Sequence, residues 1–473
     1  MPSSAAVYQR VDRYFRVSER GSTFGRETRG GIATFFTMAY ILVLNPIILS
    51  GARDVNGAQL SYPQVVTVTA LVAAVMTALM GLTANLPLAL AAGLGLNTMV
   101  AYQVAPLMSW PDAMGLVVLE GIIICLLAVT GLREAVMNAI PMQLKQAISV
   151  GIGMFIAFIG MVNAGFVTRI PDVAGTTVPV RLGAAGELAG WPVLVFCLGV
   201  LLALSLLARR VKGAILLSIV AMTVLAIAIN QIADIDDLDW GLTVPALPSE
   251  VVAAPDFGLI GAFSVFGAFG KVSLITALLL VFTLFLTDFF DTMGTAVAVT
   301  NEAGLLDEQG RVPNLGRLLF VDGLATVAGG AASGSSNTSY IESAAGVGEG
   351  ARTGFANLIT GALFILALFF APLAAVVPGQ AAAPALVAVG YLLMTQVRHI
   401  DWTDPGIAIP AFLTLALMPF TFSITNGIGA GFIAYVVVRT ALGRAREVHW
   451  LLWGAAAVFV IYFAINPLEE LLA

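Results

Sequence analysis

Apolar residues gather along the chain in long runs separated by short polar stretches. The first seven runs cover roughly 31–50, 63–83, 86–104, 113–131, 148–167, 191–208 and 214–232. Seven more cover about 273–298, 314–331, 333–350, 355–378, 382–398, 406–421 and 425–442, and a further run lies at 450–468. Because about 20 apolar residues are needed to cross a bilayer, this pattern predicts an all-α polytopic membrane protein with about 14 transmembrane segments and an extra C-terminal apolar segment.

A polar stretch divides the chain near its middle, and its acids are Asp234, Asp236, Asp237, Asp239, Glu250 and Asp256. We therefore expect five parts. They are an N-terminal lead-in (1–30), a first seven-segment repeat (31–232), a linker (233–272), a second seven-segment repeat (273–442) and a C-terminal extension (443–473).

The positions of lysine and arginine indicate how the chain is oriented. Six arginines lie within the first 30 residues, which contain no apolar core and so do not resemble a cleavable signal peptide. Later basic clusters follow the fourth, sixth, eighth, tenth, twelfth and fourteenth runs. Since basic loops stay in the cytoplasm, we expect a cytoplasmic N-terminus and an extracytoplasmic linker. Seven is odd, so the second repeat must enter from the opposite side, as in an inverted repeat.

The third and tenth runs do not have the composition of continuous helices. Residues 85–97 contain Pro87, Gly93 and Gly95, and residues 333–350 are rich in Ser, Thr, Asn and Gly. Pro and Gly weaken helix interiors by about 3 and 1 kcal/mol, and irregular backbone survives at membrane depth only inside protein or beside a water-filled cavity. Interrupted segments at matching positions of two repeats indicate the substrate site of a transporter.

Composition removes several other classes of protein. Residues of the apolar set make up 59% of the chain and charged residues only 11%, less than half the roughly 25% of a soluble domain. The net charge of −6 comes without a basic stripe, which argues against a nucleic-acid partner. Cys125 and Cys197 lie in apolar runs and His399 and His449 are far apart, so we expect no disulfide, metal or cofactor.

The eighth run carries two acids at membrane depth, Asp288 and Asp291. Thr292 and Thr295 follow four and seven residues after Asp288, so we expect all four side chains on one helical face. A carboxylate at this depth costs about 2.5–3.5 kcal/mol and usually has a function. Like charges close together repel, so we expect one of the two aspartates to hold a proton and couple it to transport. The alternative, that one of them only caps a half-helix, stays open.

The two interrupted runs supply the other candidates. Glu342, followed by Ser343, lies in the tenth run, where it is either a substrate ligand or a helix-start carboxylate satisfied by nearby amides. Asn97 follows the glycines of the third run, and its amide can donate and accept at once, as a heterocycle requires. A buried asparagine that only bonds a neighbouring helix is the equal alternative.

Two further acids, Glu120 and Asp322, lie in the fourth and ninth runs. We interpret both as structural contacts between helices, since neither adjoins an interrupted run. The middle of the interrupted runs and the eighth run contain no lysine or arginine. An anion transporter would need such a cation or helix N-termini, so acids without a base favour a neutral or cationic substrate that donates hydrogen bonds.

Four segments together resemble the AzgA-like purine permeases of the nucleobase/cation symporter family. They are Thr-Asp288-Phe-Phe-Asp291-Thr-Met-Gly-Thr, Asn-Thr-Ser-Tyr-Ile-Glu342-Ser-Ala-Ala-Gly, Gly-Leu-Gly-Leu-Asn97 and Thr-Phe-Phe-Thr-Met-Ala-Tyr40-Ile. The resemblance covers about 26 to 445. It leaves the C-terminal run unexplained.

This resemblance implies seven plus seven inverted helices, short strands in the third and tenth segments, and a core domain that moves against a gate domain. It implies uptake of hypoxanthine, guanine or adenine with protons, across the inner membrane, by a homodimer. Asn97, Asp288, Asp291 and Glu342 fall on positions that such permeases use for binding or transport, with Thr292, Thr338 and Ser343 as further candidates beside them.

Two other functions remain as alternatives. A transporter of the same fold could carry uracil, xanthine or an inorganic anion. An intramembrane hydrolase is also conceivable, because Asp288 and Asp291 could mimic an aspartyl dyad. The apolar runs offer no histidine as a base, which disfavours the hydrolase.

Overall fold

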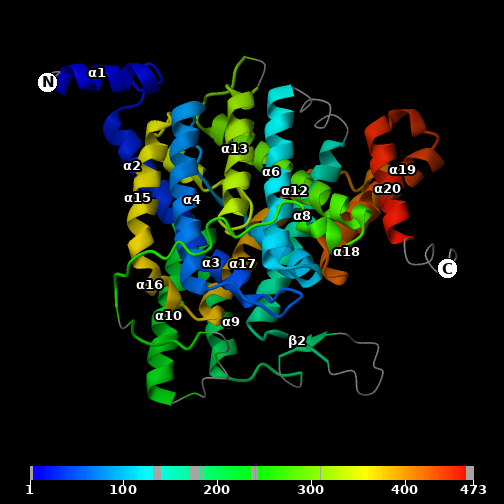
Figure 1. Ribbon diagram of the computed structural model, residues 1–473, viewed down its shortest axis with the longest axis horizontal. Helices are drawn as coiled ribbons and strands as arrows, with labels where there is room; N and C mark the ends of the chain where they lie inside the picture. The colour runs from blue at the N-terminus through cyan, green and yellow to red at the C-terminus, as the bar shows by residue number, and fades with distance from the viewer. Residues whose placement is uncertain are drawn as a thin grey trace.

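The computed structural model describes residues 4–130, 140–170, 180–183, 186–233, 235, 240, 243–248, 250–308 and 311–464. They form a bundle of helices with two very short sheets (Figure 1). Four acids of the predicted linker, at positions 234, 236, 237 and 239, lie outside the described residues. The mostly helical architecture predicted from the apolar runs is confirmed.

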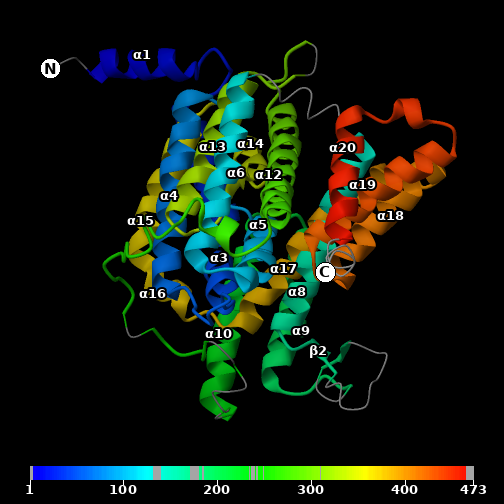
Figure 2. The same ribbon diagram turned by 45° about the vertical axis from the view of Figure 1, so that its right-hand side comes forward.

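The first half begins with an amphipathic helix, α1 (Ser4–Phe15), that lies across one end of the bundle (Figure 2). The helices that follow are α2 (Phe24–Met38), α3 (Ile41–Gly51), α4 (Tyr62–Thr83), α5 (Leu94–Met99), α6 (Trp110–Thr130), α8 (Met142–Asn163), α9 (Trp191–Ala208) and α10 (Ala214–Ala233). A π-helical turn, η1 (Val100–Val104), and a 3-10 turn, η2 (Ala105–Leu107), extend α5. A hairpin of β2 (Val167–Arg169) and β3 (Val180–Leu182) follows α8.

The second half is also built mainly of helices. After η3 (Gly267–Gly270) come α12 (Leu274–Glu302), α13 (Leu315–Ala331), α14 (Ser343–Gly348), α15 (Phe355–Ala367), η4 (Leu368–Phe370), α16 (Ala371–Ala375), α17 (Gly379–Met394), η5 (Thr395–His399), α18 (Pro405–Phe420) and α19 (Ile424–Ala441). A 3-10 turn, η6 (Ala445–Glu447), leads into α20 (Trp450–Phe463). The residues of the C-terminal run beyond 464 lie outside the described part.

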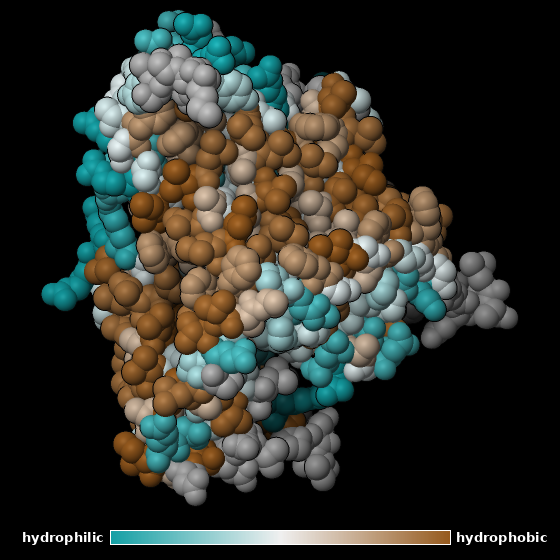
Figure 3. Space-filling model, turned by 60° about the vertical axis from the view of Figure 1, so that its left-hand side comes forward, coloured by the Kyte–Doolittle hydropathy of each residue, from teal (hydrophilic) through white to brown (hydrophobic). Residues whose placement is uncertain are grey.

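Within the described residues, ten helical stretches are long and apolar enough to cross a membrane. Large apolar side chains cover the outside of the bundle, among them Leu201 (65% exposed), Val224 (61%) and Phe412 (54%). Figure 3 shows a broad hydrophobic field across one face, with hydrophilic residues gathered toward its ends. A surface of this kind is stable against lipid and not against water.

The third and tenth runs meet in a two-stranded antiparallel sheet at the centre of the bundle. Strand β1 (Leu90–Ala92) pairs with β4 (Asn337–Ser339), with Ala91 opposite Thr338, and every residue of both strands is buried. The amide of Gly93 also donates to the Ser336 carbonyl over 3.0 Å. Backbone groups that a helix would have paired internally are therefore paired across the two segments, as a low-dielectric interior requires.

Chain reversals on either side of this sheet use backbone conformations that most residues avoid. Ser333 and Ser335 have φ values of 57° and 71°, directly after α13 ends, and Asn85 has a φ of 52° before β1. Left-handed backbone is uncommon outside glycine, although asparagine tolerates it better than most. These turns redirect each segment from a helix into the short strand.

The helices pack as two clusters (Figure 2). In the first cluster, α2 to α6 pack with α12 to α15 around the β1–β4 sheet. In the second cluster, α8, α9 and α10 pack with α17, α18 and α19, and α20 lies beside α19. Contacts between the clusters are made chiefly by α2, α3, α5 and α12 on one side and by α8, α10, α17 and α19 on the other.

Small residues let the helices of the first cluster approach closely, and this gives a test of the packing. A Cβ added at Gly81 of α4 would lie 2.3 Å from the Gly354 carbonyl oxygen at the start of α15. We expect Gly81→Ala to lower the free energy of unfolding by about 1–3 kcal/mol, because a rigid backbone atom cannot move away. Gly454→Ala in α20, where nothing lies within 4 Å, is the matched control. Thermal unfolding of both purified variants in detergent would measure the difference, and equal melting temperatures would contradict the packing.

Candidate functional site

Polar side chains surround the β1–β4 sheet, in the middle of an otherwise apolar bundle. They come from α12 and α13, from the two interrupted runs and from the break between α2 and α3. The sequence candidates Asp288, Thr292, Thr338, Glu342 and Ser343 all lie at or beside this sheet.

Asp288 points into the protein and is fully buried. Its Oδ2 accepts hydrogen bonds from the hydroxyls of Thr326 on α13, at 2.7 Å, and of Ser336, at 3.1 Å. Its Oδ1 has no hydrogen-bond partner among the described residues. The carboxylate is thus held from one side by neutral hydroxyls, and the Glu120 carboxyl lies next to it.

A second hydroxyl network joins α12, α13 and β4. The Thr292 hydroxyl donates to Asp322 Oδ1 over 2.7 Å, and its oxygen lies 2.8 Å from the Thr338 hydroxyl. Because Thr292 has only one hydroxyl hydrogen, Thr338 must be the donor in that second bond. Ser339 donates to the same Asp322 oxygen over 3.1 Å. Thr292 and Thr338 therefore serve first to tie β4 to the helices.

Glu120 and Asp322, interpreted from the sequence as structural contacts away from the interrupted runs, lie against the tenth run in space. Both are fully buried, and Glu120 Oε2 and Asp322 Oδ2 have no partner within the described part of the chain. The hydroxyl of Ser336 lies 3.5 Å from Glu120 and 3.1 Å from Asp288. The premise that neither acid adjoins an interrupted run was wrong. Residues 120 and 336 are distant along the chain, and only the fold brings them together. The available signal was their acidity within apolar runs.

Asp291 has different surroundings from Asp288. Asp291 is exposed, whereas Asp288 is fully buried. A separation of three residues turns the second side chain by about 60° around the helix axis. Asp288 then faces α13 while Asp291 faces away from it, so the expected common face holds for Asp288, Thr292 and Thr295, which are buried, and not for Asp291.

Glu342 lies at the start of α14 and is partly exposed. The hydroxyl of Tyr40, from the break between α2 and α3, donates a hydrogen bond to its carboxylate. Ser343, next to it, accepts from the amide of Ala89 over 3.0 Å and so connects the two interrupted runs. Glu342 keeps accessible surface, whereas Ser343 is buried.

Asn97 is fully buried, and neither its Nδ2 nor its Oδ1 has a partner among the residues that the structure describes. It lies one helical turn after Gly93, where an added Cβ would come within 2.8 Å of the Thr338 methyl. A buried, unpaired amide costs about 1–3 kcal/mol. Such a group is typical of a binding site, where a ligand or water completes its hydrogen bonds.

Within the described residues, none of the ion pairs involves Asp288, Asp291, Glu342, Glu120 or Asp322. No group of three His, Cys, Asp or Glu side chains suited to a metal ion was found in that part of the chain either. The site presents hydrogen-bond acceptors and one free amide, and so it suits a ligand rich in N–H groups.

Comparison with known proteins also indicates a transporter. The sequence profile of a family described as "Permease family" matches residues 25–429. The chain belongs to this permease family. It is therefore a multi-pass membrane transporter and not an enzyme, and the resemblance noted from four short segments is confirmed.

Relatives of known activity span almost the whole chain. The guanine/hypoxanthine permease PbuG of Bacillus subtilis (strain 168) is 38% identical over 460 residues, covering 95% of this chain and 98% of its own. The adenine permease AdeP of Escherichia coli (strain K12) is 36% identical and covers 95% of each chain. Among solved structures, the transmembrane domain of a cyanobacterium bicarbonate transporter, BicA, matches with a TM-score of 0.60 at 15% identity, covering 86% of this chain and 97% of its own. At that identity the likeness shows the fold alone.

Proposed function

We propose that this permease takes up purine nucleobases, namely hypoxanthine, guanine or adenine, and binds them between the interrupted third and tenth runs. The observation that carries the proposal is a set of unpaired polar atoms around one small sheet, on Asp288 and Asn97, beside the partly exposed Glu342. A purine presents ring N–H donors to carboxylates and ring nitrogens to an amide. Relatives named for guanine, hypoxanthine and adenine transport support the same substrate class.

An inorganic anion is the second candidate, because transporters of bicarbonate share the fold. Anion sites are built from cations, bidentate arginines or helix N-termini. The acids of this site lack any described ion pair, and their repulsion would oppose an anion. The chemistry of the site therefore favours the purine.

Competition uptake separates the two candidates. Cells that lack their own purine permeases and express this chain should take up labelled hypoxanthine or adenine. Excess guanine, hypoxanthine, adenine or xanthine would rank the preferred base, and excess bicarbonate should have no effect. Purine uptake no greater than in cells with an empty vector would reject the proposal.

The finer architecture that we propose has 14 segments in two inverted repeats. Ten are the long apolar helices, and the other four are the interrupted third and tenth segments and the shorter α13 and α18. Helix contacts support the repeat. When two segments are in contact, their counterparts seven segments away along the chain are in contact too. The contact between α6 and α13 corresponds to that between α15 and α4, and the contact between α8 and α18 corresponds to that between α17 and α9.

The domain boundaries proposed here are those predicted from the sequence, with repeats at 31–232 and 273–442 between the lead-in, linker and extension. The first cluster would be the core domain and the second the gate domain. The separation of the two clusters supports a movement of one cluster against the other. Among the described residues, hydrogen bonds within each cluster outnumber those between the clusters. Such a movement would expose the site alternately to the two sides.

We further propose an inner-membrane homodimer with the N-terminus in the cytoplasm and a proton as coupling ion. Contacts between basic segments support the orientation. Lys212, between α9 and α10, pairs with Glu349 after α14, and Arg20 donates to the carbonyls of Asn85 and Arg352. These segments thus lie at one end of the bundle, where the positive-inside rule places the cytoplasm.

The linker should then face outward. In a variant with Cys125 and Cys197 replaced by serine, Glu250→Cys should react with an impermeant thiol reagent applied from the periplasmic side. Glu308→Cys, in the loop after α12, should react only after the inner membrane is opened. Both residues are exposed. The reverse pattern would overturn the proposed orientation.

A further inference from the structure

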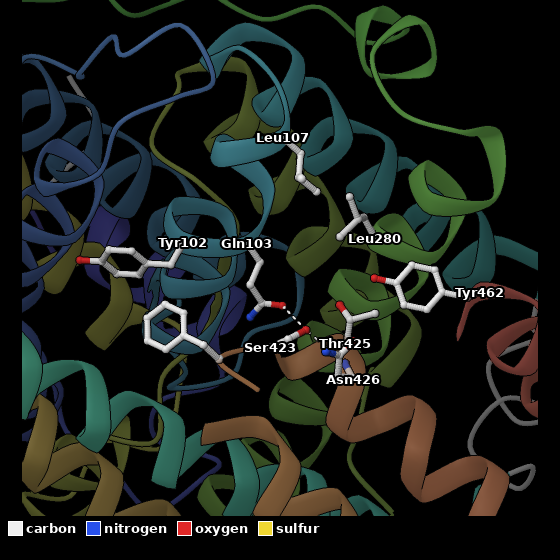
Figure 4. A pocket seen from close by; sticks show the side chains of 9 residues that line it. Tyr102, Gln103, Leu107, Leu280, Ser423, Thr425, Asn426 and Tyr462 are labelled. Carbon is white, nitrogen blue, oxygen red and sulfur yellow. Dashed lines mark hydrogen bonds between the residues drawn. The ribbon is translucent and has the colours of Figure 1, made fainter. Parts of the chain in front are cut away.

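A polar cavity lies between the two clusters, apart from the carboxylates at the sheet. It has a volume of about 250 Å³ and lies where the third run ends, where α12 and α19 begin, and beside α20 (Figure 4). Its lining includes Gln103, Leu107, Phe422, Thr425, Asn426 and Tyr462. Drug-sized ligands occupy pockets of about 300–1,000 Å³, so this cavity suits a smaller molecule.

Gln103 is held in one orientation and keeps two donors free. Its Oε1 accepts from the Ser423 hydroxyl over 3.2 Å and from the Ile424 amide over 3.1 Å. Since a backbone N–H can only donate, the atom that faces Ile424 must be the oxygen. The amide nitrogen of Gln103 is buried, and it has no partner among the described residues.

Thr425 adds a second unused group to the cavity. Its side chain is 2% exposed, and its hydroxyl has no partner in the part of the chain that the structure describes. Figure 4 shows the hydroxyl of Tyr462 turned toward Thr425 and Asn426. Two buried polar groups without partners in one cavity point to a ligand that supplies acceptors.

Aromatic side chains form the walls. Phe422 has a φ of 51°, which holds it at the tight turn between α18 and α19, and its ring lies 6.0 Å from that of Tyr102. Tyr102 and Tyr462 line the cavity with it. Aromatic rings favour planar ligands, because stacked and edge-on contacts add about 0.5–1.5 kcal/mol beyond burial alone.

We propose that this cavity is a second, outer subsite for a planar nitrogen heterocycle, which binds there before it reaches the sheet. The assignment rests on the proposed function and identifies its substrate class at a new place. Gln103 would donate to a ring nitrogen or carbonyl of the base, and Thr425 to a second acceptor. Gln103 follows Asn97 by six residues on the same segment, which corresponds to a rise of roughly 9 Å. A ligand would therefore move only a short distance from one amide to the other.

Thiol labelling tests whether this cavity is occupied. In a background with Cys125 and Cys197 replaced by serine, Asn426→Cys would be reacted with a small thiol reagent, with and without the transported purine. The same measurement would be made with Glu342→Gln, which disables the site at the sheet. Leu107→Cys provides a second position in the lining. Asn56→Cys, in the exposed loop between α3 and α4, is the control outside the cavity.

Purine at ten times its dissociation constant for the cavity should slow labelling at 426 and 107 about tenfold, whether residue 342 is glutamate or glutamine. Labelling at 56 should not change. Thr425→Val, which keeps the shape and removes the hydroxyl, should raise the concentration for half-protection about two- to tenfold.

Protection that disappears in Glu342→Gln would overturn the subsite, because labelling would then report a movement driven from the sheet. Unchanged labelling in a protein that transports the purine would also overturn it, and the proposed function would stand. A wild-type protein that neither binds nor transports purines would reject both.

Discussion

Replacement of Glu342 by glutamine should weaken purine binding at the sheet by about tenfold or more, while the protein still inserts and folds. The change keeps the size of the side chain and removes its charge, and hydrogen bonds to a charged acceptor are about twice as strong as neutral ones. Loss of one charged hydrogen bond costs about 1.5–3 kcal/mol, which corresponds to an affinity loss of roughly tenfold to more than a hundredfold. Equilibrium binding of labelled purine to the purified variant measures it.

The matched control lies in the same segment. Glu349→Gln removes a carboxylate that pairs with Lys212 near the end of the bundle, away from the sheet. It should bind purine normally. Tyr40→Phe should lie between the two, because it removes the hydroxyl that orients the Glu342 carboxylate. Near-normal affinity in Glu342→Gln would remove this residue from the site.

Asp288→Asn and Asp291→Asn should separate purine uptake from the pH gradient. Asp288 is fully buried beside Glu120 and Asp322, with no described cation in the group, whereas Asp291 keeps accessible surface. We expect a proton to enter through such acids, because burial of an uncompensated charge is unfavourable. In proteoliposomes with an imposed pH gradient, the wild-type protein should concentrate purine, and at least one of the two variants should only equilibrate it.

Glu302→Gln, at the exposed end of the same helix, is the control and should concentrate purine as the wild type does. Which aspartate carries the proton follows from the comparison of the two variants. Uptake that ignores the pH gradient or follows sodium would refute proton coupling. Normal accumulation by both variants would clear the two aspartates of the role.

The apolar runs predicted most of the helices closely. The run at 191–208 coincides with α9, and 214–232 ends one residue before α10 does. The first run, 31–50, began too late, since α2 begins at Phe24 and includes Glu27. That acid is fully buried, and its carboxylate accepts from the amides of Arg352 and Thr353. Apolar content alone does not show such a partner, because it lies more than 300 residues away.

The candidate site was only partly accessible to sequence reasoning. Proline, glycine and acids at membrane depth indicated a site at the third, eighth and tenth runs. The resemblance implied short strands in the third and tenth. Hydropathy could not show that Glu120 and Asp322 contact the tenth run, since a single sequence does not reveal which helices are neighbours. It also could not show that Asp291 is exposed while Asp288 is buried, because that depends on which side of α12 meets α13.

Counterflow by the purified protein is the most direct measurement. Liposomes that contain only this chain would be loaded with unlabelled hypoxanthine or adenine and diluted into a trace of the labelled base, with no ion gradient imposed. A purine permease should accumulate label transiently inside the loaded liposomes, and Glu342→Gln should not. Absence of any transient with guanine, hypoxanthine and adenine, in liposomes where the protein is folded and inserted, would contradict purine transport by this site.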